Sequence, residues 1–189
     1  MSVYFSEKEF KTLSVSSGGL QKGEYDNCSF VNCELAEANL SGSTFVECEF
    51  INCNLSMVKL FLTSFKDVKF NNCKLLGLQF NNCNPFLLSL DFSNCNLNLA
   101  SFYKLKLKGI NFKNCSLEEV DFVETDLSNG IFEECNLAQA TFENTILIKT
   151  DFRTAYNYSI DPEKNTIDNA KFSLAGTRGL LTKYNIEIE

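Results

Sequence analysis

The nine cysteines are the residues of this chain best suited to chemistry, because a thiolate can bind a metal, form a disulfide or attack a substrate. Their usual partner is missing: the 189 residues include no histidine, which is the common general base and metal ligand. Several cysteines recur at intervals of 20 residues. Which of these reactions is open to them therefore depends on how the fold arranges residues at that interval. The nine are Cys28, Cys33, Cys48, Cys53, Cys73, Cys83, Cys95, Cys115 and Cys135.

Acidic residues are the second group with chemical potential. Adjacent carboxylates catalyse proton transfer when a desolvated, concave pocket shifts their pKa values. Neither a histidine nor a glycine-rich loop ahead of a helix accompanies them here. We therefore predict no catalytic residue, no cofactor and no enzyme activity, and we assign the acids to a partner-binding surface. Its members are Glu118, Glu119, Asp121, Glu124, Asp126, Glu133 and Glu134.

A five-residue repeat determines where these side chains lie. A large apolar residue, here called a centre, occupies every fifth position from residue 30 to residue 80 and again from 92 to 152. The position two residues before a centre is small or slender, and all nine cysteines occupy it. Five residues turn an α-helix by about 500° and bring a flat strand to its opposite face. Neither element would keep the centres on one side.

The repeat fits a four-sided coil in which each side takes five residues and two of them point inward. Four sides make a coil of 20 residues, and successive coils pair as parallel strands roughly 4.8 Å apart. Residues 20 apart should then stack, as Phe92, Phe112 and Phe132 do in this register. We predict an all-β solenoid, a quadrilateral β-helix whose core is sealed by neighbouring coils.

The coil places the cysteines in the core, where we expect reduced thiols that act as small hydrophobic residues. A stacked column does not converge on one zinc ion, so we predict no metal. Disulfides fit the column spacing, but the count is odd and the start MSVYFSEKEF is unlike an export signal, so we expect a cytoplasmic protein. The longest apolar runs are only a few residues, as at 85–88, so we predict that no segment spans a membrane and that the protein has no membrane partner.

An asparagine or glutamate precedes every cysteine in the sequence. In a 20-residue coil, Asn32, Asn52 and Asn72 should stack into a ladder of side-chain hydrogen bonds, each worth roughly 1 kcal/mol.

The repeat divides the chain into three parts. Residues 1–24 lack the small inward residue and contain Ser-Ser-Gly-Gly, so we expect an irregular N-terminal cap. Residues 25–172 should form the β-helix, with a register slip of two residues near 81–91 and Pro85 as its pivot. Residues 173–189 should form a short helix and an exposed strand that cap the rod and pair two chains. The expected dimer seam is Leu174, Leu180, Leu181, Tyr184, Ile186 and Ile188.

The repeat resembles that of the pentapeptide-repeat proteins, in which a small residue, Asp or Asn, and Leu or Phe precede two variable residues. Close matches are Ala38-Asn39-Leu40, Cys53-Asn54-Leu55, Cys95-Asn96-Leu97 and Cys135-Asn136-Leu137. The resemblance covers roughly residues 25–152 and implies a right-handed, four-sided β-helix. Quinolone-resistance members of the family pair through their C-terminal ends, so the resemblance also implies a homodimer.

Charge is distributed in bands along a chain whose net charge is −7. Residues 24–50 and 118–151 are acidic, whereas residues 59–113 hold eight lysines and two aspartates. Family members that protect DNA gyrase are acidic rods thought to imitate DNA, so the resemblance implies binding to a type II topoisomerase, quinolone protection and no direct nucleic-acid contact. The basic band departs from a uniformly acidic rod.

A second interpretation is a structural scaffold or assembly protein with another protein partner. In it, the charge bands neutralise one another across coils, each surface pair being worth less than about 1 kcal/mol. The expected pairs are Lys104 with Glu124, Lys106 with Asp126 and Lys113 with Glu133.

Overall fold

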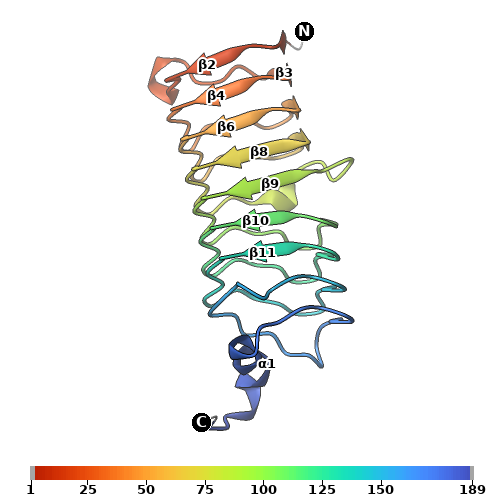
Figure 1. Cartoon of the computed structure of the whole chain (residues 1–189). Coiled ribbons are helices and arrows are strands. Elements are labelled where there is room, and N and C mark those ends of the chain that lie inside the picture. Colours follow the sequence, from red (N-terminus) through yellow and green to blue (C-terminus); the bar gives the residue numbers. More distant parts are fainter. Residues whose placement is uncertain (1–2, 188–189) are drawn as a thin grey trace.

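The computed structural model describes residues 3–187, and the chain winds into a rod of stacked coils whose strands run parallel (Figure 1). The strands are β1 (Val3–Ser6), β2 (Glu9–Lys11), β3 (Gly23–Asp26), β4 (Ser29–Val31), β5 (Thr44–Val46), β6 (Glu49–Ile51), β7 (Ser64–Lys66), β8 (Val68–Asn71), β9 (Leu90–Ser93), β10 (Asn111–Lys113) and β11 (Ile131–Glu133). The helical segments are η1 (Val15–Ser17), η2 (Phe80–Asn82), η3 (Ala175–Thr177), α1 (Arg178–Leu181) and η4 (Thr182–Tyr184).

Two parallel sheets run along the rod. One has the order β1-β3-β5-β7, and the other has the order β11-β10-β9-β8-β6-β4-β2. Paired residues are 20 apart, as in Tyr25 with Phe45 and Phe50 with Phe70. This register confirms the predicted β-solenoid with 20 residues in each ordinary coil.

The corners of the coil explain which residues precede the cysteines. The residue two positions past a centre has a positive φ, between 53° and 54° at Asn32, Asn52 and Asn72. Asparagine tolerates this left-handed conformation better than most residues, and glycine adopts it freely, as Gly42 does at φ 69°. One rung of the expected side-chain ladder forms, between Asn72 Nδ2 and Asn52 Oδ1, which are 2.6 Å apart. The left-handed backbone recurs at most of these corners, and the exceptions are Asn82 and Thr154, two positions past Phe80 and Phe152.

Stacked aromatic rings fill the interior. The longest column has successive ring centroids 4.5–5.5 Å apart. Each such pair adds about 0.5–1.5 kcal/mol beyond the burial of its area. The column consists of Phe10, Phe30, Phe50, Phe70, Phe92, Phe112, Phe132, Phe152 and Phe172.

One coil is longer than the others. Strand β8 pairs with β9 at an offset of 22 residues, as in Phe70 with Phe92, so two extra residues enter between η2 and β9. The loop stays attached to the coil before it, because the backbone amide of Asn84 donates to Thr63 O at 2.9 Å. A second aromatic column changes sides here. It runs through Phe5, Tyr25, Phe45 and Phe65 before the loop, and through Phe80, Phe102, Phe122 and Phe142 after it.

The N-terminal segment differs from the irregular cap expected over residues 1–24. Strands β1 and β2 pair in parallel with β3 and β4, so this segment adds a regular coil to the rod. The physical reason is aromatic stacking: Phe5 lies 5.0 Å from Tyr25 and Phe10 lies 5.1 Å from Phe30. These contacts replace the small inward residues that the segment lacks.

The C-terminal end carries the expected helical cap, but the cap is made of the short segments η3, α1 and η4. Ile186 and Glu187 belong to no strand, and Ile188 and Glu189 lie outside the described residues. Gly176 and Gly179 bring the cap onto Tyr158, because a Cβ at either glycine would collide with that side chain. No helix in residues 3–187 has the length and apolar character needed to cross a membrane.

Candidate functional site

The cysteines lie inside the coil, and each is a buried, free thiol. Six of them stack in one column, from Cys33 to Cys135. Their sulfurs donate to backbone carbonyls, as Cys53 Sγ does to Phe30 O at 3.2 Å. Burial raises the pKa of Cys48 to about 11 and that of Cys83 to about 12. Within residues 3–187, no three cysteines or acids are arranged to hold a metal ion. The thiols therefore pack as core residues.

This burial predicts slow thiol chemistry in the folded protein. The native protein should react with Ellman's reagent at pH 8 only as fast as it unfolds, because the folded coil shields the buried thiols from the reagent. All nine should react within seconds to minutes in denaturant. The measurement is the absorbance of released thionitrobenzoate with and without guanidinium chloride. Fast labelling of the native protein, or fewer than nine thiols after unfolding, would contradict the assignment to the core.

The seven acids of the predicted partner-binding surface form a belt around the rod. Their positions relative to the buried centres place Glu118 on one side of the coil, Asp121 on the next, Asp126 on the third and Glu133 on the fourth. Glu119, Glu124 and Glu134 occupy corners, with φ between 52° and 56°. The structure thus brings the seven together within a single turn of the coil but not on one face.

Lysines from the preceding coil neutralise part of this belt. Nζ of Lys104 lies 3.5 Å from Glu124, and Nζ of Lys113 lies 3.0 Å from Glu133, as predicted. Glu118 Oε1 instead accepts a hydrogen bond from Asn136 Nδ2 at 2.6 Å.

Asp126 pairs with Lys108, 3.4 Å away, and not with the predicted Lys106. The reason is local: Asp126 Oδ1 accepts hydrogen bonds from the backbone and hydroxyl of Ser128. The other carboxylate oxygen, Oδ2, then faces Lys108. Lys108 lies 20 residues before Ser128, at the same position of the preceding coil. Burial would raise the pKa of Asp126, but the hydrogen bonds from Ser128 and the charge of Lys108 outweigh it and lower the pKa.

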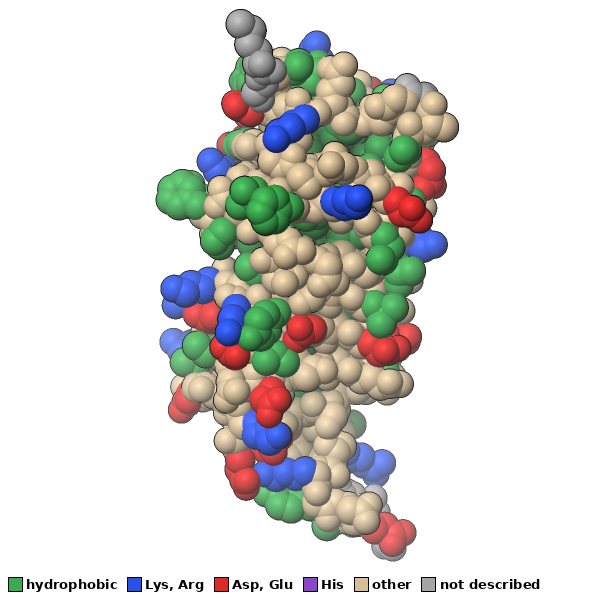
Figure 2. All heavy atoms as spheres, turned by 180° about the vertical axis from the view of Figure 1, so that it is seen from behind, with side chains coloured by type: hydrophobic (Ala, Val, Ile, Leu, Met, Phe, Trp, Pro, Cys, Tyr) green, Lys and Arg blue, Asp and Glu red, His purple; other side chains and the backbone are tan. Residues whose placement is uncertain are grey.

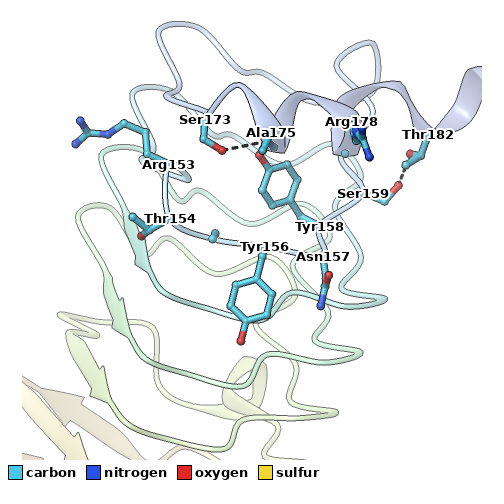
Figure 3. A pocket seen from close by; sticks show the side chains of 13 residues that line it. Arg153, Thr154, Tyr156, Asn157, Tyr158, Ser159, Ser173, Ala175, Arg178 and Thr182 are labelled. Atoms are coloured by element: carbon cyan, nitrogen blue, oxygen red, sulfur yellow. Dashed lines mark hydrogen bonds between the residues drawn. The ribbon is translucent and has the colours of Figure 1, made fainter. Parts of the chain in front are cut away.

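A cleft of about 620 Å³ lies between the last coil and the C-terminal cap. Figure 3 shows Tyr158 pointing across it toward Ala175, while Tyr156 points away from the cap. Arg153 also points away and is held by Asp151, with Nη2 to Oδ2 at 2.7 Å. The Tyr158 hydroxyl is buried without a hydrogen-bond partner, and burial raises the pKa of Tyr158. The cleft therefore encloses space, but its lining residues do not pair a nucleophile with an activating base.

The predicted dimer seam is partly exposed at the rod tip. Leu174 is 90% exposed, and Tyr184 and Ile186 are about half exposed. Leu180 and Leu181 are half-buried, and Leu180 packs on the core of the rod. Ile188 lies outside the described residues.

A second exposed apolar group lies in the middle of the rod and does not follow from the repeat alone. Phe61, Leu62, Phe86 and Leu87 are each 57–67% exposed. Their sequence signal is their register: Phe61 and Leu62 come one and two residues past the buried centre Leu60, so they must point outward. Phe86 and Leu87 belong to the loop that holds the two extra residues.

Comparisons with known proteins agree with this architecture. Family models described as pentapeptide repeat region and pentapeptide repeats (8 copies) match residues 20–85 and 43–122, and residues 121–156, respectively. No curated protein has a sequence that matches the chain.

Solved structures with a similar fold include a trypsin-treated variant of QnrB1, described as a plasmid-mediated fluoroquinolone resistance protein. It is 18% identical, the match covers 100% of this chain and 98% of QnrB1, and the TM-score is 0.48. Another is HetL from the cyanobacterium Nostoc, described as involved in heterocyst differentiation regulation. It is 18% identical, with 89% of this chain and 86% of HetL covered and a TM-score of 0.43.

Proposed function

Because the chain belongs to the pentapeptide-repeat family, we propose that it is a non-catalytic, protein-binding β-solenoid. One observation carries this proposal: the interior is filled by aromatic, leucine and cysteine side chains, so polar chemistry is confined to the outer surface, which is convex along the rod apart from the cleft beside the C-terminal cap. A convex, hydrated surface shifts pKa values little and does not enclose a small substrate. A rigid rod is well suited to presenting side chains at fixed spacing to another protein.

We propose a type II topoisomerase, DNA gyrase in bacteria, as the first candidate partner, with protection against quinolones. This rests on resemblance to the gyrase-protecting members of the family and on the acidic belt of residues 118–134, which would take the place of DNA phosphates. Glu119 and Glu134 support it best, because these exposed carboxylates make no ion pair within residues 3–187.

The expected result is restored activity of gyrase under drug. Micromolar protein should recover supercoiling of relaxed plasmid in the presence of a fluoroquinolone, read on an agarose gel. The double variant Glu119→Gln/Glu134→Gln should need about tenfold more protein, which corresponds to about 1.4 kcal/mol of binding free energy. Glu37→Gln is the matched control, since Glu37 is an exposed corner residue with φ 60° near the other end of the rod.

Absence of recovery together with absence of binding at micromolar concentration would remove gyrase as the partner. Equal behaviour of the belt variant and the Glu37→Gln control would remove the acidic belt as the contact surface.

A structural scaffold for a different protein is the second candidate. The neutralisation of Glu124, Asp126 and Glu133 by lysines favours it, because three of the seven belt acids already have a partner within the chain. In either function we propose a cytoplasmic homodimer that pairs through the exposed Leu174, Tyr184 and Ile186 at the rod tip.

A further inference from the structure

The strongest unassigned feature is the apolar patch formed by Phe61, Leu62, Phe86 and Leu87. Phe86 is 67% exposed and Phe61 is 65% exposed. Figure 2 shows large apolar side chains standing out at the upper left of this face of the rod, with further ones along its right margin. Contiguous apolar groups on a protein surface commonly mark an interaction site.

The patch is held in place by the fold. The backbone amide of Leu62 donates to Asn82 O at 2.9 Å, and that of Asn84 donates to Thr63 O at 2.9 Å. These bonds set the loop that carries Phe86 and Leu87 one coil beyond Leu62. Within the loop, the backbone amide of Phe86 donates to Asn84 Oδ1 at 3.0 Å. The patch is therefore presented in a defined geometry, which lowers the entropy cost of binding.

Positive charge borders the patch. Lys59 precedes Phe61 by two residues and points outward on the same side of the coil, because both flank the buried Leu60. Lys66 Nζ lies 5.8 Å from the ring centroid of Phe86. Salt bridges within residues 3–187 involve neither lysine. Both charges are thus available to a carboxylate from outside.

Charge also decides against a second copy of this chain as the occupant. A two-fold pairing of patch on patch would bring Lys59 and Lys66 of both copies together, and Asp67 is the one carboxylate in residues 51–90 that could offset them. Like charges placed across an interface cost free energy. The apolar patch with its lysine border instead matches a surface in which apolar side chains are flanked by aspartate or glutamate.

We propose that this patch binds an acidic, amphipathic segment of a partner protein. The inference rests on the proposed protein-binding function and adds a second contact surface, opposite in charge to the acidic belt. Apolar side chains of the segment cover Phe61, Leu62, Phe86 and Leu87, and its carboxylates pair with Lys59 and Lys66.

A phage-displayed library of random 15-residue peptides provides the probe, selected on the full-length protein. Enriched peptides should combine acidic with large apolar residues, and a synthetic copy should bind in a fluorescence anisotropy titration. Binding should weaken at least about tenfold in Phe61→Ser and in Phe86→Ser, and weaken further as salt is raised. Ile131→Ser is the matched control, because Ile131 is 45% exposed on strand β11, away from the patch.

Each variant alters an exposed side chain, and circular dichroism melting verifies that it folds. Failure to enrich any peptide, enrichment of basic peptides, or equal weakening by Ile131→Ser would overturn the proposal. Light scattering that finds wild-type dimers dissociated by Phe86→Ser would also overturn it, in favour of self-association. The gyrase assay is separate: loss of drug protection with patch-dependent peptide binding intact would reject gyrase and retain the patch.

Discussion

Replacement of Phe122 by alanine should lower the free energy of unfolding by about 3–5 kcal/mol. The ring is fully buried. It stacks on Phe102 at 5.4 Å and on Phe142 at 5.2 Å. It also meets Phe112 and Phe132 edge-on at 6.1 and 5.9 Å. The variant leaves a cavity that neighbours in two columns cannot close, since the stacked backbone fixes their spacing. Urea denaturation followed by far-ultraviolet circular dichroism measures the loss.

The matched control is Phe86→Ala, which removes the same atoms from a side chain that is 67% exposed. Its stability should remain within about 0.5 kcal/mol of wild type. A similar loss in both variants would mean that the effect is not one of core packing, and an unchanged Phe122→Ala would place that ring outside the core.

Substitution of alanine for Gly176 should dislodge the C-terminal cap and destabilise the protein by about 1–3 kcal/mol. A Cβ at this position would collide with the Tyr158 hydroxyl and lie 3.1 Å from its Cζ. Removal of the hydroxyl in Tyr158→Phe should be nearly neutral or stabilising, because the buried hydroxyl has no hydrogen-bond partner to lose. The combined variant should therefore recover part of the loss caused by Gly176→Ala.

Thermal unfolding of the four proteins in this double-mutant cycle measures the coupling between the two positions. Additive effects would show that Gly176 and Tyr158 do not contact one another. The control for helix propensity is Ala175→Gly, which changes the neighbouring residue of the same helical segment and adds no Cβ against Tyr158. Glycine is the poorer helix former by about 1 kcal/mol, so its effect bounds the propensity contribution.

The interior could be predicted from sequence because two constraints coincide on the same residues. A centre such as Phe112 must point inward to bury its ring, and its partners 20 residues away must do the same for strands to pair. Any other register would expose a whole column at once. The two-residue slip could be predicted for the same reason, because all the centres after it shift together by two positions between Phe80 and Phe92.

The ends and the surface were less predictable for a physical reason. In the first coil, Phe5 and Phe10 preserve the repeat by stacking alone, without the small residues that identify it elsewhere. At the surface, the position of one charged residue does not determine its ion-pair partner. Asp126 pairs with Lys108 rather than Lys106, because the hydrogen bond from Ser128 orients its carboxylate. Such choices depend on local hydrogen bonds that the five-residue period does not encode. The exposed patch was encoded in the register, at Phe61 and Leu62.

The regular first coil has a consequence for polymerisation. Within residues 3–187, strands β1 and β2 are the terminal strands of their sheets, and an unpaired strand edge is a template for fibre growth. Here the rim is guarded by charge: Lys8 Nζ sits over the Phe5 ring at 5.1 Å, and Lys11 pairs with Glu9 at 2.7 Å. A second chain that paired with this edge would have to desolvate these charged side chains. Monodisperse rods, rather than filaments, are the outcome that this guarded edge favours.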